Sequence, residues 1–158
     1  MALDPADRTA VARQLGRTPR GARHVAHRCS CGLPDVVETT PRLPDGEPFP
    51  TLYYLTCPRA RSMVSRLESN GLMREQNERL QHDVELAARY SAAHQDYISR
   101  RDAIEQLPMG ASAGGMPERV KCLHALVAHE LAVPGINPFG AEALEQLPDW
   151  GAEGPCVQ

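Results

Sequence analysis

The chain has 158 residues, a formal net charge of −3 at pH 7 and 42% hydrophobic residues. A chain of this length fits one domain that buries roughly 68–70% of its unfolded surface, so a core can form without disulfides. The net negative charge, with only one Trp, four Tyr and two Phe, argues against a nucleic-acid-binding protein, which needs a basic surface and aromatic side chains that stack on bases.

The beginning of the chain has no basic stretch followed by an apolar stretch, and no apolar run approaches the ~18–20 residues that cross a membrane. We therefore expect a cytoplasmic protein with no membrane partner. Thiols stay reduced in that compartment, so the five cysteines are expected to be buried, metal-bound or reactive rather than cross-linked.

The first third of the chain predicts one helix and a small sheet. Asp4-Pro5 is typical of a helix start, and this helix is expected to reach about residue 15. Residues 22–29 have the pattern of a strand. Residues 36–40 and 51–56 are rich in β-branched and aromatic side chains and flank a proline-rich turn, which predicts an antiparallel hairpin. Together these segments predict a sheet of about three strands.

The rest of the chain predicts helices. Pro58 and Pro117 each suit a first helical position, so helices are expected at 58–70 and 117–132. Residues 72–106 keep helical spacing, with Asp83 as a plausible internal cap, and a short helix is expected at 141–147. We predict one α+β domain over residues 1–148, with the small antiparallel sheet packed against four to five helices, and a C-terminal tail at 149–158.

The candidate metal ligands are Cys29, Cys31, Cys57, Cys122 and His124. Cys29 and Cys31 have strand spacing, which places both side chains on one side. On a regular 117–132 helix, Cys122 and His124 lie roughly 200° apart around the axis, so His124 joins an ion on Cys122 only if the first turns are distorted. Thiolates and imidazoles are the ligands of structural zinc, which would join the sheet to this helix. An iron–sulfur cluster is the alternative cofactor.

Three other interpretations remain open. Free cysteines are often buried as small apolar side chains, and these thiols could be structural. The apolar faces of the helices at 72–106 could bind an unknown protein partner or a second copy of the chain, as an interaction module does. Cys57 precedes a helix, whose N-terminus lowers the pKa of a thiol, so a cysteine-dependent enzyme is the third interpretation. No further catalytic residue can be assigned.

Several motifs of this chain are shared with one bacterial family. They are Val25-Ala26-His27-Arg28-Cys29, Gly32 with Pro34, the loop Pro41-Arg42-Leu43-Pro44-Asp45-Gly46 with Pro48-Phe49-Pro50-Thr51, Leu55-Thr56-Cys57-Pro58, Gly114-Gly115-Met116-Pro117, Arg119-Val120-Lys121-Cys122-Leu123-His124, and Asn137-Pro138 with Gly140. On these residues, which extend over nearly the whole chain, the sequence resembles the family catalogued as domain of unknown function 501. The resemblance implies a cytosolic bacterial protein and names no activity.

Overall fold

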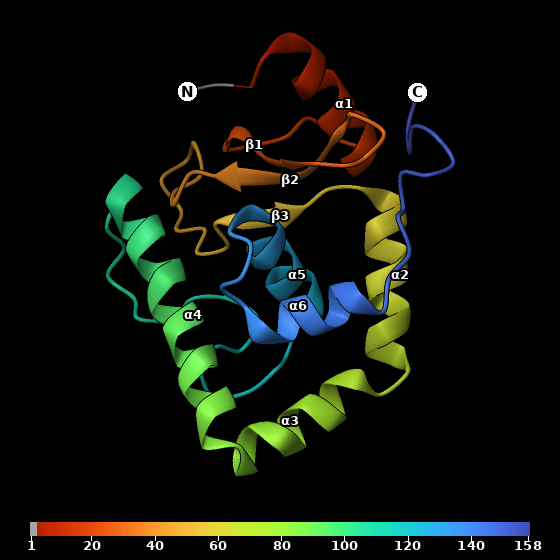
Figure 1. Ribbon diagram of the computed structural model, residues 1–158. Coiled ribbons are helices and arrows are strands. Elements are labelled where there is room, and N and C mark those ends of the chain that lie inside the picture. Colours follow the sequence, from red (N-terminus) through yellow and green to blue (C-terminus); the bar gives the residue numbers. More distant parts are fainter. Residues whose placement is uncertain (1–2) are drawn as a thin grey trace.

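The computed structural model describes residues 3–158, which form a three-stranded antiparallel sheet and six helices (Figure 1). The predicted α+β class is confirmed. The helix count is higher than the four to five expected because the long helical region is divided at Asp83. The Asp83 carboxylate accepts the backbone N–H of Leu86 and so caps a new helix.

The sheet has the strand order β1-β2-β3, with β1 at Ala22–Arg28, β2 at Pro34–Thr39 and β3 at Tyr53–Leu55. Every residue of β2 is buried, because helix α1 at Pro5–Leu15 lies on one side of the sheet and the other helices lie on the opposite side (Figure 1). The predicted hairpin is confirmed, with Val37 paired to Tyr54.

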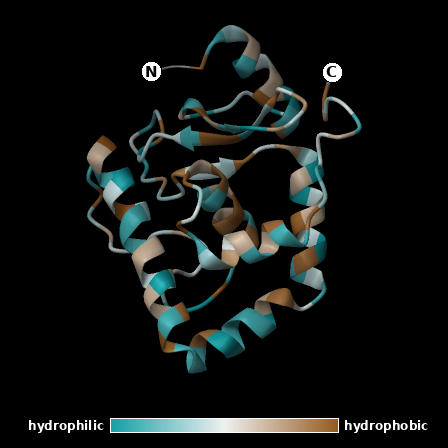
Figure 2. Ribbon diagram, in the orientation of Figure 1, coloured by the Kyte–Doolittle hydropathy of each residue, from teal (hydrophilic) through white to brown (hydrophobic). Residues whose placement is uncertain are grey.

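Helix α5, at Leu123–Ala132, is the centre of the helical layer. It packs on β3, on α2 at Pro58–Ser69 and on α6 at Pro138–Glu145, while α3 at Leu72–His82 and α4 at Val84–Ile104 complete the frame around it (Figure 1). In Figure 2, hydrophobic residues gather on α5, whereas α3 at the edge is mostly hydrophilic. Leu123, Leu126 and Val127 are fully buried, so burial of apolar surface holds α5 in place.

The predicted start of α5 at Pro117 is wrong. Residues 114–118 form a turn, and the helix begins only at Leu123. The side chain of Asn77 on α3 uses both backbone groups of Val120, accepting its N–H at 2.7 Å and donating to its carbonyl at 2.9 Å. The Gly114 carbonyl accepts the N–H groups of Lys121 and Cys122. The backbone N–H groups of residues 120–122 therefore all bond to partners outside a helix.

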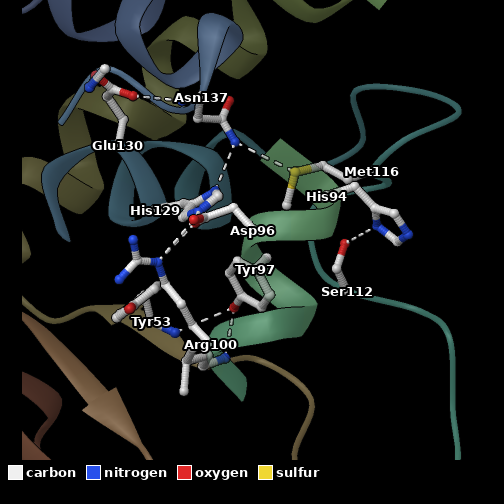
Figure 3. A network of polar contacts seen from close by, with 12 residues as sticks. Tyr53, His94, Asp96, Tyr97, Arg100, Ser112, Met116, His129, Glu130 and Asn137 are labelled. Atoms are coloured by element: carbon white, nitrogen blue, oxygen red, sulfur yellow. Dashed lines mark hydrogen bonds and ion pairs between the residues drawn. The ribbon is translucent and has the colours of Figure 1, made fainter. Parts of the chain in front are cut away.

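A buried polar network fixes the far end of α5 (Figure 3). The His129 side chain is fully buried, and its Nε2 lies 2.9 Å from the Asp96 carboxylate on α4. Its Nδ1 lies 3.2 Å from the side-chain nitrogen of Asn137, which caps α6. The ring also stacks on Tyr53 of β3. One histidine thus joins α4, α5, α6 and the sheet, which holds α5 in a single position.

The segment expected as a tail, residues 149–158, packs against the domain in this structure. The Arg59 guanidinium on α2 donates to the backbone carbonyls of Trp150, Gly154 and Pro155. The Trp150 indole N–H donates to Asp35 on β2 at 3.3 Å. Within residues 3–158, none of the helices combines the length and the apolar character needed to cross a membrane.

Candidate metal centre

One face of α2 is directed at the first turn of α5. Arg61, Ser65 and Glu68 are spaced i, i+4 and i+7, which places them on the same side of the helix. All three contact the His124 ring, through the Arg61 carbonyl at 3.1 Å, the Ser65 hydroxyl at 3.2 Å and the Glu68 carboxylate at 3.2 Å. The pocket that holds His124 is therefore built by one helix face.

Glu68, Cys122 and His124 form a cluster in which one potential ligand atom of each residue lies within 4.8 Å of the other two. The late start of α5 produces this arrangement. Cys122 has φ −147° and ψ 108°, an extended conformation outside the helix. The 200° separation expected on a regular helix does not apply, so the thiol and the imidazole can face the same point.

The contacts of His124 determine which nitrogen is free to bind a cation. A carbonyl oxygen can only accept, so we assign the ring proton to Nε2, which lies 3.1 Å from the Arg61 carbonyl. In the neutral ring, Nδ1 then presents its lone pair to the Glu68 carboxylate 3.2 Å away. Two acceptors at this distance repel each other unless a proton or a metal ion lies between them.

The net effect of the surroundings lowers the pKa of the Cys122 thiol, although the Glu68 carboxylate opposes this. Interaction with His124 lowers the pKa of the Cys122 thiol, an effect that outweighs burial and is supported by the backbone N–H of Ala125. The thiol in turn raises the pKa of His124, and Glu68 adds to this effect. A deprotonated sulfur is the form that binds metals, so this pairing prepares Cys122 as a ligand.

A cavity of about 490 Å³ opens beside the cluster. Cys122, His124 and Ser65 lie at one part of its wall, and side chains of β3, including Tyr53 and Tyr54, form another part. Glu68 is not among the residues that line the cavity. Two of the three residues of the cluster, Cys122 and His124, are therefore in contact with the cavity.

A family model described as "Protein of unknown function (DUF501)" matches residues 25–145. The chain belongs to this family. The matched range includes Glu68, Cys122 and His124 and leaves out Cys156. No curated protein and no solved structure matches the chain. The family resemblance seen in the motifs is thus confirmed, and the chemistry of this DUF501 protein has to be argued from its own residues.

The structure brings together only part of the predicted ligand set. Cys122 and His124 meet, but Cys29, Cys31 and Cys57 are not part of their cluster. Cys57 precedes the first turn of α2 and Glu68 lies in its last turn, which separates them by about 16 Å along the helix axis. Metal binding by Cys29, Cys31 or Cys57 stays a prediction, and it would require a site separate from Cys122.

Cys57 is a poor candidate for the nucleophile of an enzyme in this DUF501 protein. Its side chain is fully buried, and burial raises the pKa of the thiol to about 12. The helix N-terminus does lower this pKa through the N–H groups of Ala60 and Arg59, but the effect is smaller than that of burial. Among the thiols at helix starts, Cys122 is the one with a lowered pKa.

Glu68 is the site residue that the sequence analysis missed. A carboxylate in the last turn of a helix interacts unfavourably with the negative end of the helix dipole, and this was the available signal. The structure explains the position, because Glu68 accepts the backbone N–H of Leu123 at 2.9 Å. The carboxylate thus meets the positive end of α5 while it faces His124.

Proposed function

We propose that this protein binds a divalent transition-metal ion, with zinc as the best fit, through Glu68, Cys122 and His124. The three residues offer a thiolate, an imidazole and a carboxylate, which are all common zinc ligands. A soft thiolate next to an imidazole disfavours magnesium and calcium, which prefer oxygen ligands. With one thiol in the cluster, the donor set is unsuited to an iron–sulfur cluster, which is usually held by several thiolates.

The observation that carries the proposal is the environment of His124. Its Nδ1 faces a carboxylate oxygen, and its Nε2 faces the Arg61 carbonyl. Histidines that bind metals through one nitrogen almost always donate the other N–H to a carbonyl, carboxylate or water, which fixes the ring orientation. The Arg61 carbonyl serves this purpose here.

The number of ligands favours an accessible ion. Structural zinc usually has four protein ligands, whereas catalytic zinc has three and keeps one position for water or substrate. In this protein three ligands stand beside a cavity of about 490 Å³. The ion would join α2 to α5, whereas the site predicted from the sequence joined the sheet to a helix. The same ion would also bind a small molecule in the cavity.

A zinc titration against a chromophoric chelator tests this function. We expect one tightly bound zinc per chain, with the affinity reduced at least about tenfold in His124→Gln. His82→Gln is the matched control, because His82 is exposed at the end of α3. Wild-type protein that competes no better than His124→Gln would refute the metal centre.

A second function is supported by the position of Cys122 itself. The thiol lies at the N-terminus of α5, borders the cavity and has a lowered pKa. These features are typical of a reactive cysteine, so Cys122 could act as a nucleophile in protein that holds no metal. Alkylation of Cys122 at a rate unaffected by zinc would favour this alternative over the metal centre.

An interaction module would need an exposed apolar stripe on the long helices. The described helices α3 and α4 have no such stripe. The apolar residues of α3 and α4, such as Leu80, Leu86 and Tyr90, are buried in the core of the chain itself. Among residues 3–158, Val84 is the exposed large hydrophobic side chain. A protein partner or homo-oligomer therefore stays a prediction, to be tested by light scattering over a range of concentrations.

A further inference from the structure

The cavity beside the cluster has the size and composition of a small-molecule site. Its volume of about 490 Å³ falls within the range of roughly 300–1,000 Å³ that is usual for ligand pockets. The aromatic residues Tyr53 and Tyr54 and the aliphatic residue Leu55 supply apolar wall, while Cys122 and His124 supply polar groups. Such a cavity suits a molecule with an apolar body and a polar group.

The lining contains a basic side chain whose charge no carboxylate of the described lining balances. Arg61 is the one Arg or Lys among the lining residues, and the described part of the lining contains no Asp or Glu. The guanidinium lies over the Tyr54 ring, 5.9 Å from its centroid. Within residues 3–158, no carboxylate oxygen lies within 4 Å of it, in contrast to Arg79 and Arg100, which form ion pairs. Its five N–H donors are thus available to a ligand.

The backbone of Arg61 contacts the candidate metal centre. Its backbone carbonyl accepts from the Nε2 of His124 at 3.1 Å, so Arg61 and the cluster share a hydrogen bond. Its side chain and the Cys122 and His124 side chains line the same cavity. A ligand paired with the guanidinium would therefore share the cavity with an ion held by the cluster.

We infer that this cavity binds a small organic anion, a carboxylate or a phosphate with an apolar body, and that Arg61 is its counter-charge. This inference deepens the proposed function, on which it rests for the presence of the ion beside the anion. Planar guanidinium groups match carboxylates and phosphates in a bidentate geometry, and such charge-assisted pairs are strong when partly shielded from water. The apolar wall of β3 then faces the body of the ligand.

The test measures calorimetric binding of three probes to the full-length protein, with and without one equivalent of zinc. Benzoate and phenyl phosphate carry the anionic groups, and benzamide is the uncharged match to benzoate. Arg61→Met removes the charge but keeps the backbone carbonyl that holds His124. Arg61→Lys keeps the charge. Arg66→Met is the matched control, because Arg66 is an exposed residue of the same helix outside the cavity.

We expect an anionic probe to bind and benzamide to bind at least about tenfold more weakly, a difference that Arg61→Met should abolish. Arg61→Lys should retain most of the binding and Arg66→Met all of it. The tighter binder of benzoate and phenyl phosphate shows whether the site prefers a carboxylate or a phosphate. The inference is overturned if no anionic probe binds, or if Arg61→Met binds like wild type.

Failure of the inference and failure of the metal centre give different results. If wild-type protein binds zinc but no anion, the centre stands and the anion site does not. If the protein binds no zinc but binds benzoate through Arg61, the cavity takes anions without an ion. Circular dichroism of each variant tests whether the helices are intact, and a loss of binding in a folded variant then reports the lost charge.

Discussion

Glu68 and His124 meet through Oε2 and Nδ1 at 3.2 Å, although they are 56 residues apart in the chain. The same Oε2 accepts the backbone N–H of Leu123 at 2.9 Å. One oxygen thus caps helix α5 and faces the ligand histidine. The start of the helix and the geometry of the candidate centre therefore depend on each other.

Replacement of Glu68 separates these two roles. Glu68→Gln keeps an oxygen that can accept from Leu123 but removes the charge that would bind the ion. We expect zinc affinity to fall at least about tenfold, while the metal-free protein loses no more than about 1 kcal/mol of stability. Chelator competition and thermal melts measure the two effects. Glu78→Gln, on the exposed face of α3, is the control and should change neither.

Cobalt spectra distinguish the cysteines. A thiolate bound to Co²⁺ gives an intense charge-transfer band in the near ultraviolet, so Cys122→Ser should lose this band if the thiol is a ligand. Cys57→Ser should keep it, because Cys57 lies at the opposite end of α2. If the band survives in Cys122→Ser and disappears in Cys57→Ser, the metal is bound by Cys57 and the thiols near β1 instead of by Cys122.

Alkylation of the native protein should modify Cys122 faster than Cys57. Cys122 borders a cavity and has a lowered pKa, whereas the buried Cys57 thiol has its pKa raised to about 12. We expect iodoacetamide at neutral pH to label Cys122 at least about tenfold faster, as measured by peptide mass spectrometry. Zinc should slow the labelling. Equal labelling of the two thiols would show that the cavity does not expose Cys122.

The buried His129 makes stability depend on pH. Burial lowers the pKa of His129, although Asp96 opposes this effect, so near its ordinary pKa of about 6.5 the unfolded chain binds more protons than the folded chain. His129 therefore lowers the free energy of unfolding as the pH falls through about 6.5. Urea unfolding at about pH 7.5 and about pH 5.5 should show a smaller loss in His129→Gln than in wild type. The same loss in both would contradict the assignment.

The C-terminal segment should contribute to stability. Arg59 donates to three carbonyls of residues 150–155, and Trp150 contacts the core. We expect a chain ending at residue 148 to unfold at a lower temperature, with a loss of about 1–3 kcal/mol. Arg59→Met should lose part of this amount, and Arg66→Met should lose little. An unchanged melting temperature in the shortened chain would show that the segment does not support the domain.

The elements that the sequence predicted well are those with local signals. Asp4 and Asp83 each accept an N–H three residues ahead, so their helix starts depend on a few neighbouring residues. The last helix was expected at 141–147, but α6 begins at Pro138 with Asn137 as its cap. The hairpin of β2 and β3 likewise follows from two β-rich runs around a turn. These features require no knowledge of distant contacts.

The start of α5 could not be predicted in this way. Pro117 is a good local signal for a helix, but the side chain of Asn77, 43 residues earlier, holds the backbone of Val120. Two hydrogen bonds between residues far apart in the chain thus prevent the helix start that Pro117 favours locally. The wrong helix start also placed the side chains of Cys122 and His124 on different sides of the predicted helix, because a regular helix would point them apart.

The sequence by itself determined the family, the α+β class, the hairpin and most helix starts, because these depend on residue types and on short-range hydrogen bonds. It also identified Cys122 and His124 as candidate ligands. Only the tertiary structure added Glu68, separated Cys57 from Cys122 and placed Arg61 in the cavity. The packing of α2 on α5 decided these features, since contacts over 50 or more residues arise from burial of whole helix faces and leave no spacing pattern in the chain.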